Sequence, residues 1–408
     1  KIKMTLKNST QSKTPSLFMV YLACLSMLGY LAIDMYLPAF GMMQRELSIS
    51  EGAVSNSLSI FLFGFAVAQL LWGPLSDKLG RKPILLIGLS FFSLGCLGML
   101  WVDSAAGLLT MRFLQAFGVC SAAVIWQALV IDRFDESRAQ HVFASIMPLV
   151  ALSPALAPLI GAFLLNHGGW RMIFMLLMAI TLVLMLPTLM LKNIKQKSVI
   201  DAGPSTVSFL TLLKSPIYAG NVLVYASCSA GFFAWLAGSP IILEKMGYSP
   251  QDIGLSYIPQ TIAFMVGGYG CRILLSKMSG KTLLPLLLIG YAVSMTALFL
   301  VAKYTHPTLT TILIPFCIMA VMNGASYPIA VSNALSAYPE VSGKAAALQN
   351  ALQLGLCSLA SFIVSAFISQ QPLINTTAIM ALTAIPMALG YFIQRNKSVS
   401  KHTVQATE

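Results

Sequence analysis

Charged residues are scarce in this chain. Of its 408 residues, 9% are charged and 57% are hydrophobic. Soluble domains carry about 25% charged residues, and so little polar surface could not cover so apolar a core. The composition therefore excludes a soluble globular protein and indicates a chain that crosses a membrane several times.

Clusters of residues that perform enzyme or metal chemistry are also missing. The seven cysteines form no CxxC pair and fall in apolar segments or at their ends, and the four histidines lie far apart. This spacing disfavours a metal site or a disulfide framework. The sequence also has no nucleotide-binding loop and no nucleophile–base pattern. We therefore expect neither an enzyme nor a cofactor.

The net charge of +12 raises the question of nucleic-acid binding. A nucleic-acid-binding surface needs basic residues gathered on one face or along one helix. Here the basic residues punctuate the loops between apolar runs. We therefore expect the protein to lie in a lipid bilayer and to bind no nucleic acid.

Twelve segments are long and apolar enough to cross a bilayer, which takes about 20 residues per helix. They predict an all-α membrane protein. The expected spans are 17–38, 53–73, 83–102, 106–131, 141–165, 170–191, 217–243, 252–275, 282–302, 308–335, 343–369 and 373–394.

Lysine and arginine fix the expected orientation. An even number of spans places both termini on one side, and twenty of the 25 basic residues fall on that side. Four fall on the other side, namely Arg45, Arg171, Lys245 and Lys303, and Arg112 lies within a span. Because cytoplasmic loops carry the excess of basic residues, we expect both termini in the cytoplasm.

One long connection divides the chain. KNIKQKSVIDAGPSTVSFLTLLKSP (192–216) is polar in its middle and carries glycine and proline, which is typical of a cytoplasmic linker. It separates an N-terminal six-helix bundle (1–191) from a C-terminal bundle with a cytoplasmic tail (217–408). SDKLGRKPIL (76–85) and SKMSGKTLLP (276–285) occupy similar places in the two halves. Duplicated six-helix halves are a known plan of transporters.

GPLSDKLGRKP (73–83) resembles the loop signature of the major facilitator superfamily. The resemblance implies a latch that stabilises one orientation of the two halves, formed by Gly73, Asp77, Gly80, Arg81 and Lys82. In this interpretation Gly73 permits close approach of backbones and Gly80 a tight turn, while Asp77 pairs with a basic group or a helix N-terminus.

Two further stretches carry the same resemblance. LTMRFLQAFG (109–118) is similar to a second family signature, and SPALAPLIGA (153–162) to the antiporter signature, with alanine at both outer glycine positions. Small residues still allow tight helix packing, and prolines bend a helix. We expect hinge or packing roles for Pro154, Pro158 and Gly161.

DMYLPAF (34–40) together with WGPLSDKLGRKP (72–83) resembles the Bcr/CflA drug-resistance branch of the superfamily. Stretches such as GNVLVYASCSAGFFAWLAGSP (220–240) and GKAAALQNALQLGLC (343–357) look most like purine-nucleoside carriers within that branch. The resemblance implies a monomeric, alternating-access transporter in the bacterial inner membrane, driven by the proton gradient.

Asp34 is an acid in a segment otherwise built for hydrocarbon, where a charge costs at least about 2.5–3.5 kcal/mol. Asp34 and Arg112 lie at matched depth, roughly 6–9 Å from the same end of their spans at 1.5 Å per residue. Aspartate can release a proton, whereas arginine cannot. We predict that Asp34 is the proton-coupling residue and Arg112 its electrostatic partner. A static helix-packing pair is the alternative.

Polar and aromatic residues within the spans are the candidates for lining a substrate cavity. Aromatic rings could stack on a nucleobase, and amides could donate and accept hydrogen bonds, although such residues also join helices or face lipid. The candidates are Tyr30, Gln115, Trp126, Gln127, Phe232, Trp235, Tyr257, Gln260, Asn323, Tyr327, Gln349, Asn350 and Gln353.

Two functions remain open at this point. The first is proton-coupled transport of a small molecule, with purine nucleosides as the expected substrates. The alternative is multidrug efflux by drug/proton antiport. Apart from Asp34, the acids near the spans lie at span ends, which favours neutral or weakly charged substrates over strong cations.

Overall fold

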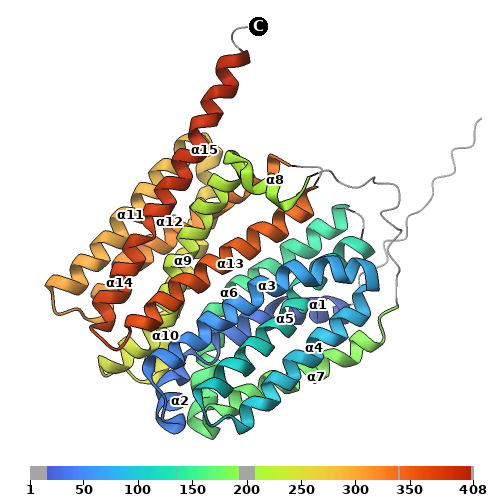
Figure 1. Cartoon of the computed structure of the whole chain (residues 1–408), viewed down its shortest axis with the longest axis vertical. Coiled ribbons are helices and arrows are strands. Elements are labelled where there is room, and N and C mark those ends of the chain that lie inside the picture. Colours follow the sequence, from blue (N-terminus) through green and yellow to red (C-terminus); the bar gives the residue numbers. More distant parts are fainter. Residues whose placement is uncertain (1–15, 135, 193–206, 339–340, 406–408) are drawn as a thin grey trace, which may run out of the picture.

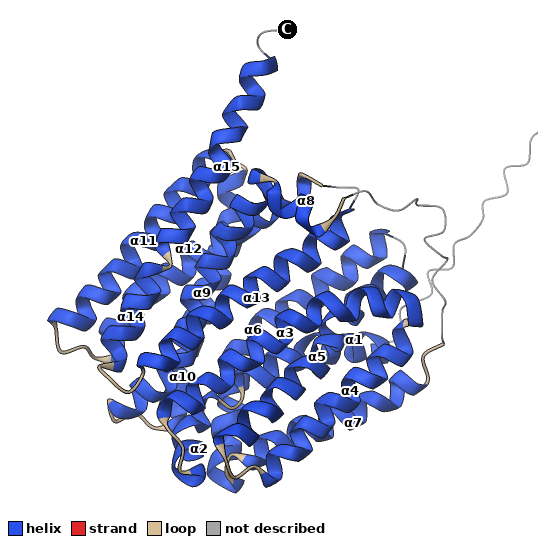
Figure 2. Cartoon of the chain, viewed as in Figure 1, coloured by secondary structure: helices blue, strands red, loops and turns tan. Residues whose placement is uncertain are grey.

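The computed structural model describes residues 16–134, 136–192, 207–338 and 341–405, and every regular element in these ranges is helical (Figure 2). The N-terminal half contains α1 (Ser16–Asp34), η1 (Leu37–Ala39), α2 (Phe40–Leu47), α3 (Glu51–Leu79), α4 (Arg81–Gly98), η2 (Met99–Trp101), α5 (Ala105–Arg133), α6 (Glu136–Gly168) and α7 (Arg171–Leu189). The C-terminal half contains α9 (Pro216–Lys245), α10 (Pro250–Leu275), α11 (Gly280–Tyr304), α12 (Leu309–Ser336), α13 (Ser342–Phe367), α14 (Pro372–Leu382) and α15 (Ala384–Gln405). The short helix α8 (Phe209–Lys214) precedes α9.

The helices confirm a multi-pass membrane protein. Within the described ranges, eleven segments are long and apolar enough to cross a membrane. The remaining expected span, 252–275, is the 26-residue helix α10. It is long enough, but proline, glycine, glutamine, serine and tyrosine occupy many of its positions. The twelve expected spans thus all have a helical counterpart.

The two sets of helices lie side by side (Figure 1). Helix α2 marks one end of the molecule and α8 the opposite end, which we call the α2 end and the α8 end. Across the boundary, α3 packs along α13 and α6 along α10. One continuous apolar core contains residues from both halves. Residues 193–206 of the expected linker lie outside the described ranges.

Proline shapes the ends of two spans. Pro38 has no amide proton to donate to the carbonyl of Asp34, so α1 ends at Asp34 and the chain continues as η1. In the last span, α14 and α15 are separated at Thr383. Pro386 cannot donate to the carbonyl of Leu382, which accounts for this interruption.

Candidate functional site

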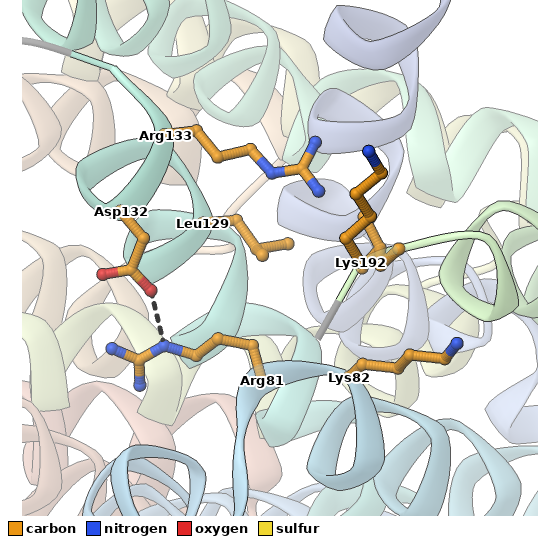
Figure 3. Close-up of a pocket in the computed structure, with 7 residues that line it drawn as sticks. Arg81, Lys82, Leu129, Asp132, Arg133 and Lys192 are labelled. Atoms are coloured by element: carbon orange, nitrogen blue, oxygen red, sulfur yellow. Dashed lines mark hydrogen bonds and ion pairs between the residues drawn. The ribbon is translucent and has the colours of Figure 1, made fainter. Parts of the chain in front are cut away.

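The loop between α3 and α4 lies at the α8 end and forms a network of charges. Arg81 contacts Asp77 and donates from Nε to Asp132 Oδ2 on α5 at 2.9 Å (Figure 3). Arg81 also donates to the Ser76 hydroxyl at 2.7 Å, and Lys82 donates to the carbonyl of Leu189. Each of these contacts lies within the N-terminal half.

The two glycines of this loop differ in their roles. Gly80 has a φ of 99°, a left-handed conformation that favours glycine, and it separates α3 from α4. Gly73 was expected to permit close approach of backbones, and that expectation is wrong. A Cβ at Gly73 would meet Val124 at 3.9 Å, an ordinary contact, because the neighbouring helix does not come close enough to need glycine there.

Asp34 occupies the last position of α1, where the chain leaves the helix. Its side chain is buried, and the Oδ2 atom has no hydrogen-bond partner among the described residues. Tyr30, on α1, and Tyr257, on α10 of the other half, lie near this carboxyl group. An ionised carboxylate is costly to bury without a partner. The site therefore suits a carboxyl group that carries its proton.

Arg112 is completely buried within the N-terminal half. Its guanidinium lies 4.0 Å from the ring centroid of Tyr36 and 4.2 Å from that of Phe61. It donates to Gln115 Oε1 at 2.6 Å and to the carbonyl of Ala32 at 3.0 Å. Aromatic faces attract a desolvated cation by about 2 kcal/mol. These rings and oxygens surround the Arg112 guanidinium where a carboxylate partner was expected.

The expected contact between Asp34 and Arg112 is absent. Both residues are described, and no ion pair joins them. The matched depth of the two residues was an estimate along the helix axis only. Side chains also turn by about 100° per residue around the axis. Asp34 lies near Tyr257 of the C-terminal half, whereas the contacts of Arg112 are all with residues of the N-terminal half.

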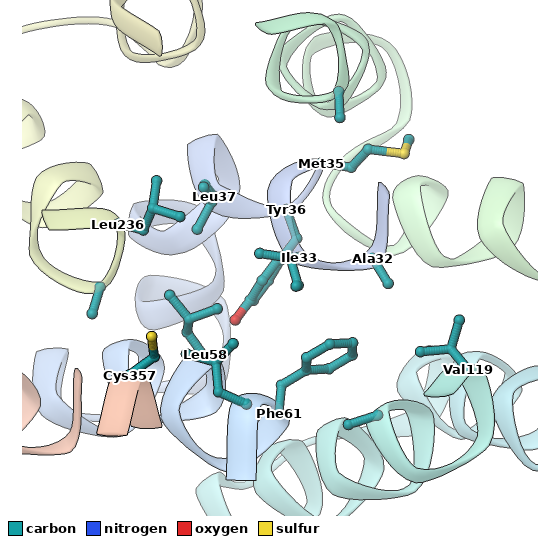
Figure 4. Close-up of a cluster of buried hydrophobic side chains, with 14 of the residues drawn as sticks. Ala32, Ile33, Met35, Tyr36, Leu37, Leu58, Phe61, Val119, Leu236 and Cys357 are labelled. Atoms are coloured by element: carbon teal, nitrogen blue, oxygen red, sulfur yellow. The ribbon is translucent and has the colours of Figure 1, made fainter. Parts of the chain in front are cut away.

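The surroundings of these two residues are mostly apolar. Figure 4 shows Ile33 and Leu37 beside Leu58 of α3, with Leu236 and Cys357 of the C-terminal half close by. A low-dielectric environment strengthens any electrostatic interaction made there. A proton gained or lost by Asp34 would therefore act strongly on its neighbours.

A second polar group combines three predicted residues with two that were not predicted. Tyr225 donates its hydroxyl to Gln353, and its ring meets that of Tyr327 edge-on with centroids 4.8 Å apart. Gln353 in turn donates to Ser229 at 2.9 Å. Tyr30 lies near Tyr327, which brings the N-terminal half to this group.

Tyr225 and Ser229 were missed by the sequence analysis. They are four residues apart on α9 and share a helix face, as Gln349 and Gln353 do on α13. The same spacing rule applied to YASCS (225–229) would have found them.

Exposure distinguishes the remaining candidates. Tyr30 is 43% exposed and Tyr327 38% exposed, although both lie well inside their helices. Because they lie near each other although they belong to different halves, both face the boundary between the halves. Tyr257 is buried, and its hydroxyl lies 2.7 Å from that of Ser239.

Other predicted residues serve as packing in this structure. The ring centroid of Trp126 lies 5.4 Å from that of Phe143, and Trp235 lies 5.4 Å from Phe316. Phe232 also packs against Phe316. Gln260 donates to the carbonyl of its helix neighbour Ser256, Asn323 and Gln349 are buried, Asn350 is half-buried and Gln127 is exposed.

Buried polar atoms without a partner concentrate in the predicted set. Nine such side-chain atoms occur among the described residues, and six belong to predicted site residues. Such atoms are rare in folded proteins. The six residues are Asp34, Arg112, Gln115, Trp235, Gln260 and Gln349.

Helix α6 approaches two neighbours very closely. A Cβ added to Gly161 would lie 1.7 Å from the carbonyl oxygen of Met35. A Cβ at Gly254 of α10 would lie 3.2 Å from the carbonyl oxygen of Pro158. Gly161 therefore holds α6 against the turn that follows Asp34, and Pro158 lies at the contact between the halves. Pro154 lies one turn earlier inside α6.

Charged residues join the two halves at the α2 end. Arg45 pairs with Glu244, and Lys245 donates to Glu51 Oε2 at 2.7 Å. These residues lie at helix ends. The sequence analysis counted their two basic residues only for topology, since no pattern shows which acid a loop cation will meet.

A row of hydroxyl groups continues this contact toward the middle of the molecule. Ser55 donates to the carbonyl of Ala237 at 2.8 Å, and Ser365 donates to Ser55 at 2.8 Å. Ser358 donates to the carbonyl of Ser59 at 2.7 Å. We call Ser55, Ser358 and Ser365 the serine seam. All of its hydrogen bonds named here cross from one half to the other.

Comparison with known proteins identifies the class. The sequence model of the Major Facilitator Superfamily matches residues 22–361. The fold is similar to a D-xylose–proton symporter (TM-score 0.73, 15% identity, 93% of this chain and 97% of that one). It is also similar to a bacterial homologue of the human lysosomal transporter Spinster in an inward-facing conformation (TM-score 0.74, 13% identity, 94% of this chain and 97% of that one). The fold is that of a secondary transporter, and the chain belongs to the Major Facilitator Superfamily.

Curated relatives indicate the branch of the superfamily to which the chain belongs. An MFS-type transporter of Bacillus subtilis, YdgK, is 31% identical over 91% of this chain and 93% of its own. Multidrug resistance protein D of Escherichia coli is 27% identical over 82% of this chain and 85% of its own length. A bicyclomycin resistance protein homologue of Haemophilus influenzae is 28% identical over 68% of this chain and 71% of its own length. These relatives support membership of the Bcr/CflA drug-resistance branch. They give no support to purine nucleosides as the substrate.

Proposed function

We propose that this protein exports neutral amphipathic drugs from the cell in exchange for protons. The observation that carries the proposal is the pairing of drug-resistance relatives with a buried carboxyl group at the boundary of the two halves. The antiporter-like stretch around Pro158 and Gly161, which packs directly against the turn after Asp34, adds support. No comparable observation supports the prediction of purine nucleosides as substrates.

In this mechanism Asp34 exchanges a proton for the drug. With Asp34 protonated, the carboxyl group is neutral and tolerates its apolar surroundings. Proton release leaves a charge that favours contact with water or with donors in the other half. Tyr257, which lies near Asp34 and whose hydroxyl is paired with that of Ser239, is a donor on the C-terminal side. Loss of the proton is thereby linked to a rearrangement between the halves.

Arg112 has a positioning role in this scheme. Its contacts to the carbonyl of Ala32 and to the ring of Tyr36 fix the chain on both sides of Asp34. Because arginine keeps its charge, these contacts persist when the charge of Asp34 changes. The tyrosines facing the boundary, Tyr30 and Tyr327, offer aromatic surface for an amphipathic substrate.

The same proposal includes the orientation and assembly of the protein. We place the α8 end in the cytoplasm of a bacterial inner membrane, because the basic residues gather there. The protein acts as a monomer, since one chain contains both halves of the pathway. The structural similarity to an inward-facing transporter and the contacts at the α2 end fit a molecule closed on its outer side.

Drug-induced proton movement tests the proposal. Everted membrane vesicles that contain the protein are energised, the pH gradient is followed with a fluorescent dye, and chloramphenicol is added. We expect chloramphenicol to collapse part of the gradient with the wild type. Asp34→Asn should abolish this response at unchanged expression. The control Asp103→Asn changes an exposed aspartate of the same half and should respond like the wild type.

Counterflow of radiolabelled inosine in proteoliposomes completes the test. The proposal predicts little inosine exchange and no inhibition by inosine of drug-driven proton movement. Robust inosine exchange that is insensitive to chloramphenicol would overturn it in favour of nucleoside transport. An unchanged proton response of Asp34→Asn would remove Asp34 from the mechanism.

A further inference from the structure

Basic side chains converge on a small pocket at the α8 end of the N-terminal half. The pocket is lined by Arg81, Lys82, Leu129, Asp132, Arg133, Leu191 and Lys192 (Figure 3). These residues come from the beginning of α4, the end of α5 and the segment after α7. Four of the lining side chains are cations and one is an anion.

The single carboxylate does not neutralise the pocket. Asp132 is bound to Arg81, whose guanidinium also contacts Asp77. Arg133, Lys82 and Lys192 form no ion pair with any residue in the described ranges. Like charges so close together repel one another, and an anion bound between them relieves that repulsion.

The cations are held in place by contacts other than ion pairs. The guanidinium of Arg133 lies 4.7 Å from the ring centroid of Phe18, and Lys82 donates to the carbonyl of Leu189. Figure 3 shows Arg133 and Lys192 on the same side of the pocket, with Arg81 and Lys82 opposite them. Arginine and lysine in this arrangement suit a phosphate group, which offers several acceptor oxygens.

An exposed apolar strip begins where the cations end. Leu182, Leu186 and Leu189 lie on one face of α7, and each is at least half exposed. Met190, which follows them, is 84% exposed. Because Lys82 is bonded to Leu189, the cationic pocket and this strip are continuous. A free phosphate ion would use only the pocket, whereas a phospholipid would use both.

We propose that this pocket binds the phosphate of an anionic phospholipid whose acyl chain lies along α7. The phosphate contacts Arg133 and Lys192, and the chain covers the strip from Met190 to Leu182. A zwitterionic lipid is disfavoured because its own cation would approach a pocket with excess positive charge. The site is separate from Asp34 and from the boundary between the halves.

Lipid titration of the purified full-length protein tests the site. Native mass spectrometry in detergent would count bound dioleoyl-phosphatidylglycerol and measure its affinity, with dioleoyl-phosphatidylcholine as the zwitterionic comparison. We expect Arg133→Gln/Lys192→Gln to weaken phosphatidylglycerol binding about 30-fold, since each basic residue near an anionic surface contributes about fivefold. The control Lys277→Gln/Lys281→Gln removes two exposed cations from the matching turn of the C-terminal half and should stay within threefold of the wild type.

Two additional measurements keep the outcome decisive. Arg133→Lys/Lys192→Arg preserves both charges and should bind phosphatidylglycerol like the wild type, which separates loss of charge from misfolding. Inorganic phosphate should neither raise the melting temperature nor compete with the lipid. The proposal is overturned by equal phosphatidylglycerol affinity of the Gln variant and the wild type, by equal binding of phosphatidylcholine, or by competition from inorganic phosphate, which would identify a free-phosphate site.

Discussion

Replacement of Gly161 by alanine should loosen the contact that supports Asp34. The added Cβ would lie 1.7 Å from the carbonyl oxygen of Met35, whereas ordinary contacts begin at 3.4 Å. The obstructing atom belongs to the backbone, so it cannot rotate away. Helix α6 and the end of α1 would have to separate by roughly 1.7 Å, and their dispersion contact would largely be lost. Overpacking of this kind costs about 1–3 kcal/mol, and we expect the upper end of that range.

The measurement is thermal unfolding of the purified variant in detergent. We expect the melting temperature to fall by about 3–4 °C, because the unfolding entropy of so long a chain is large. Because Met35 follows Asp34 directly, drug-driven proton movement should fall as well, even below the melting temperature. Gly355→Ala is the matched control, since a Cβ there would meet nothing within 4 Å in the middle of α13. Alanine suits a helix interior better than glycine, so this control should melt at or above the wild-type temperature.

Equal melting of Gly161→Ala and Gly355→Ala would refute the reasoning. It would mean that α6 and the turn after α1 are not packed as tightly as the structure has them. A lower melting temperature with full transport activity would separate packing from function, and would remove the proposed support of Asp34 by α6.

Three other changes have defined outcomes. Gly80→Ala forces a left-handed conformation on alanine and should cost about 1–2 kcal/mol, seen as a lower melting temperature. Glu244→Arg places two cations together at the α2 end. Because the native pair with Arg45 is largely exposed, we expect the free energy of unfolding to fall by no more than about 1 kcal/mol, and adding Arg45→Glu should restore it. Arg112→Lys keeps the charge but lacks the flat guanidinium that lies between Tyr36 and Phe61, so transport should be lost at near-normal expression, whereas wild-type transport rates would contradict the positioning role.

The sequence was sufficient to predict the architecture because hydrocarbon imposes strong rules. A bilayer demands long apolar helices, and each expected span has a helical counterpart within the described ranges. The α10 span shows the limit of hydropathy alone. It is polar for a span, yet length and the surrounding pattern were enough to predict it.

The local geometry of the site was harder to predict. Depth along α1 and α5 could be counted from proline and span ends, but the direction of each side chain could not. Arg112 therefore faces the rings of Tyr36 and Phe61 rather than the carboxylate of Asp34. Contacts between the halves, such as Lys245 with Glu51, were equally out of reach because nearly 200 residues separate the partners.

The serine seam has a consequence for the working cycle of the protein. Its bonds join neutral hydroxyl groups to neutral acceptors, and water can replace each of them when the two faces part. Such an exchange costs only about 1 kcal/mol per bond, far less than exposing an interlocked apolar surface. The faces can thus separate and rejoin with a small energetic input, which the proton exchange proposed above would supply.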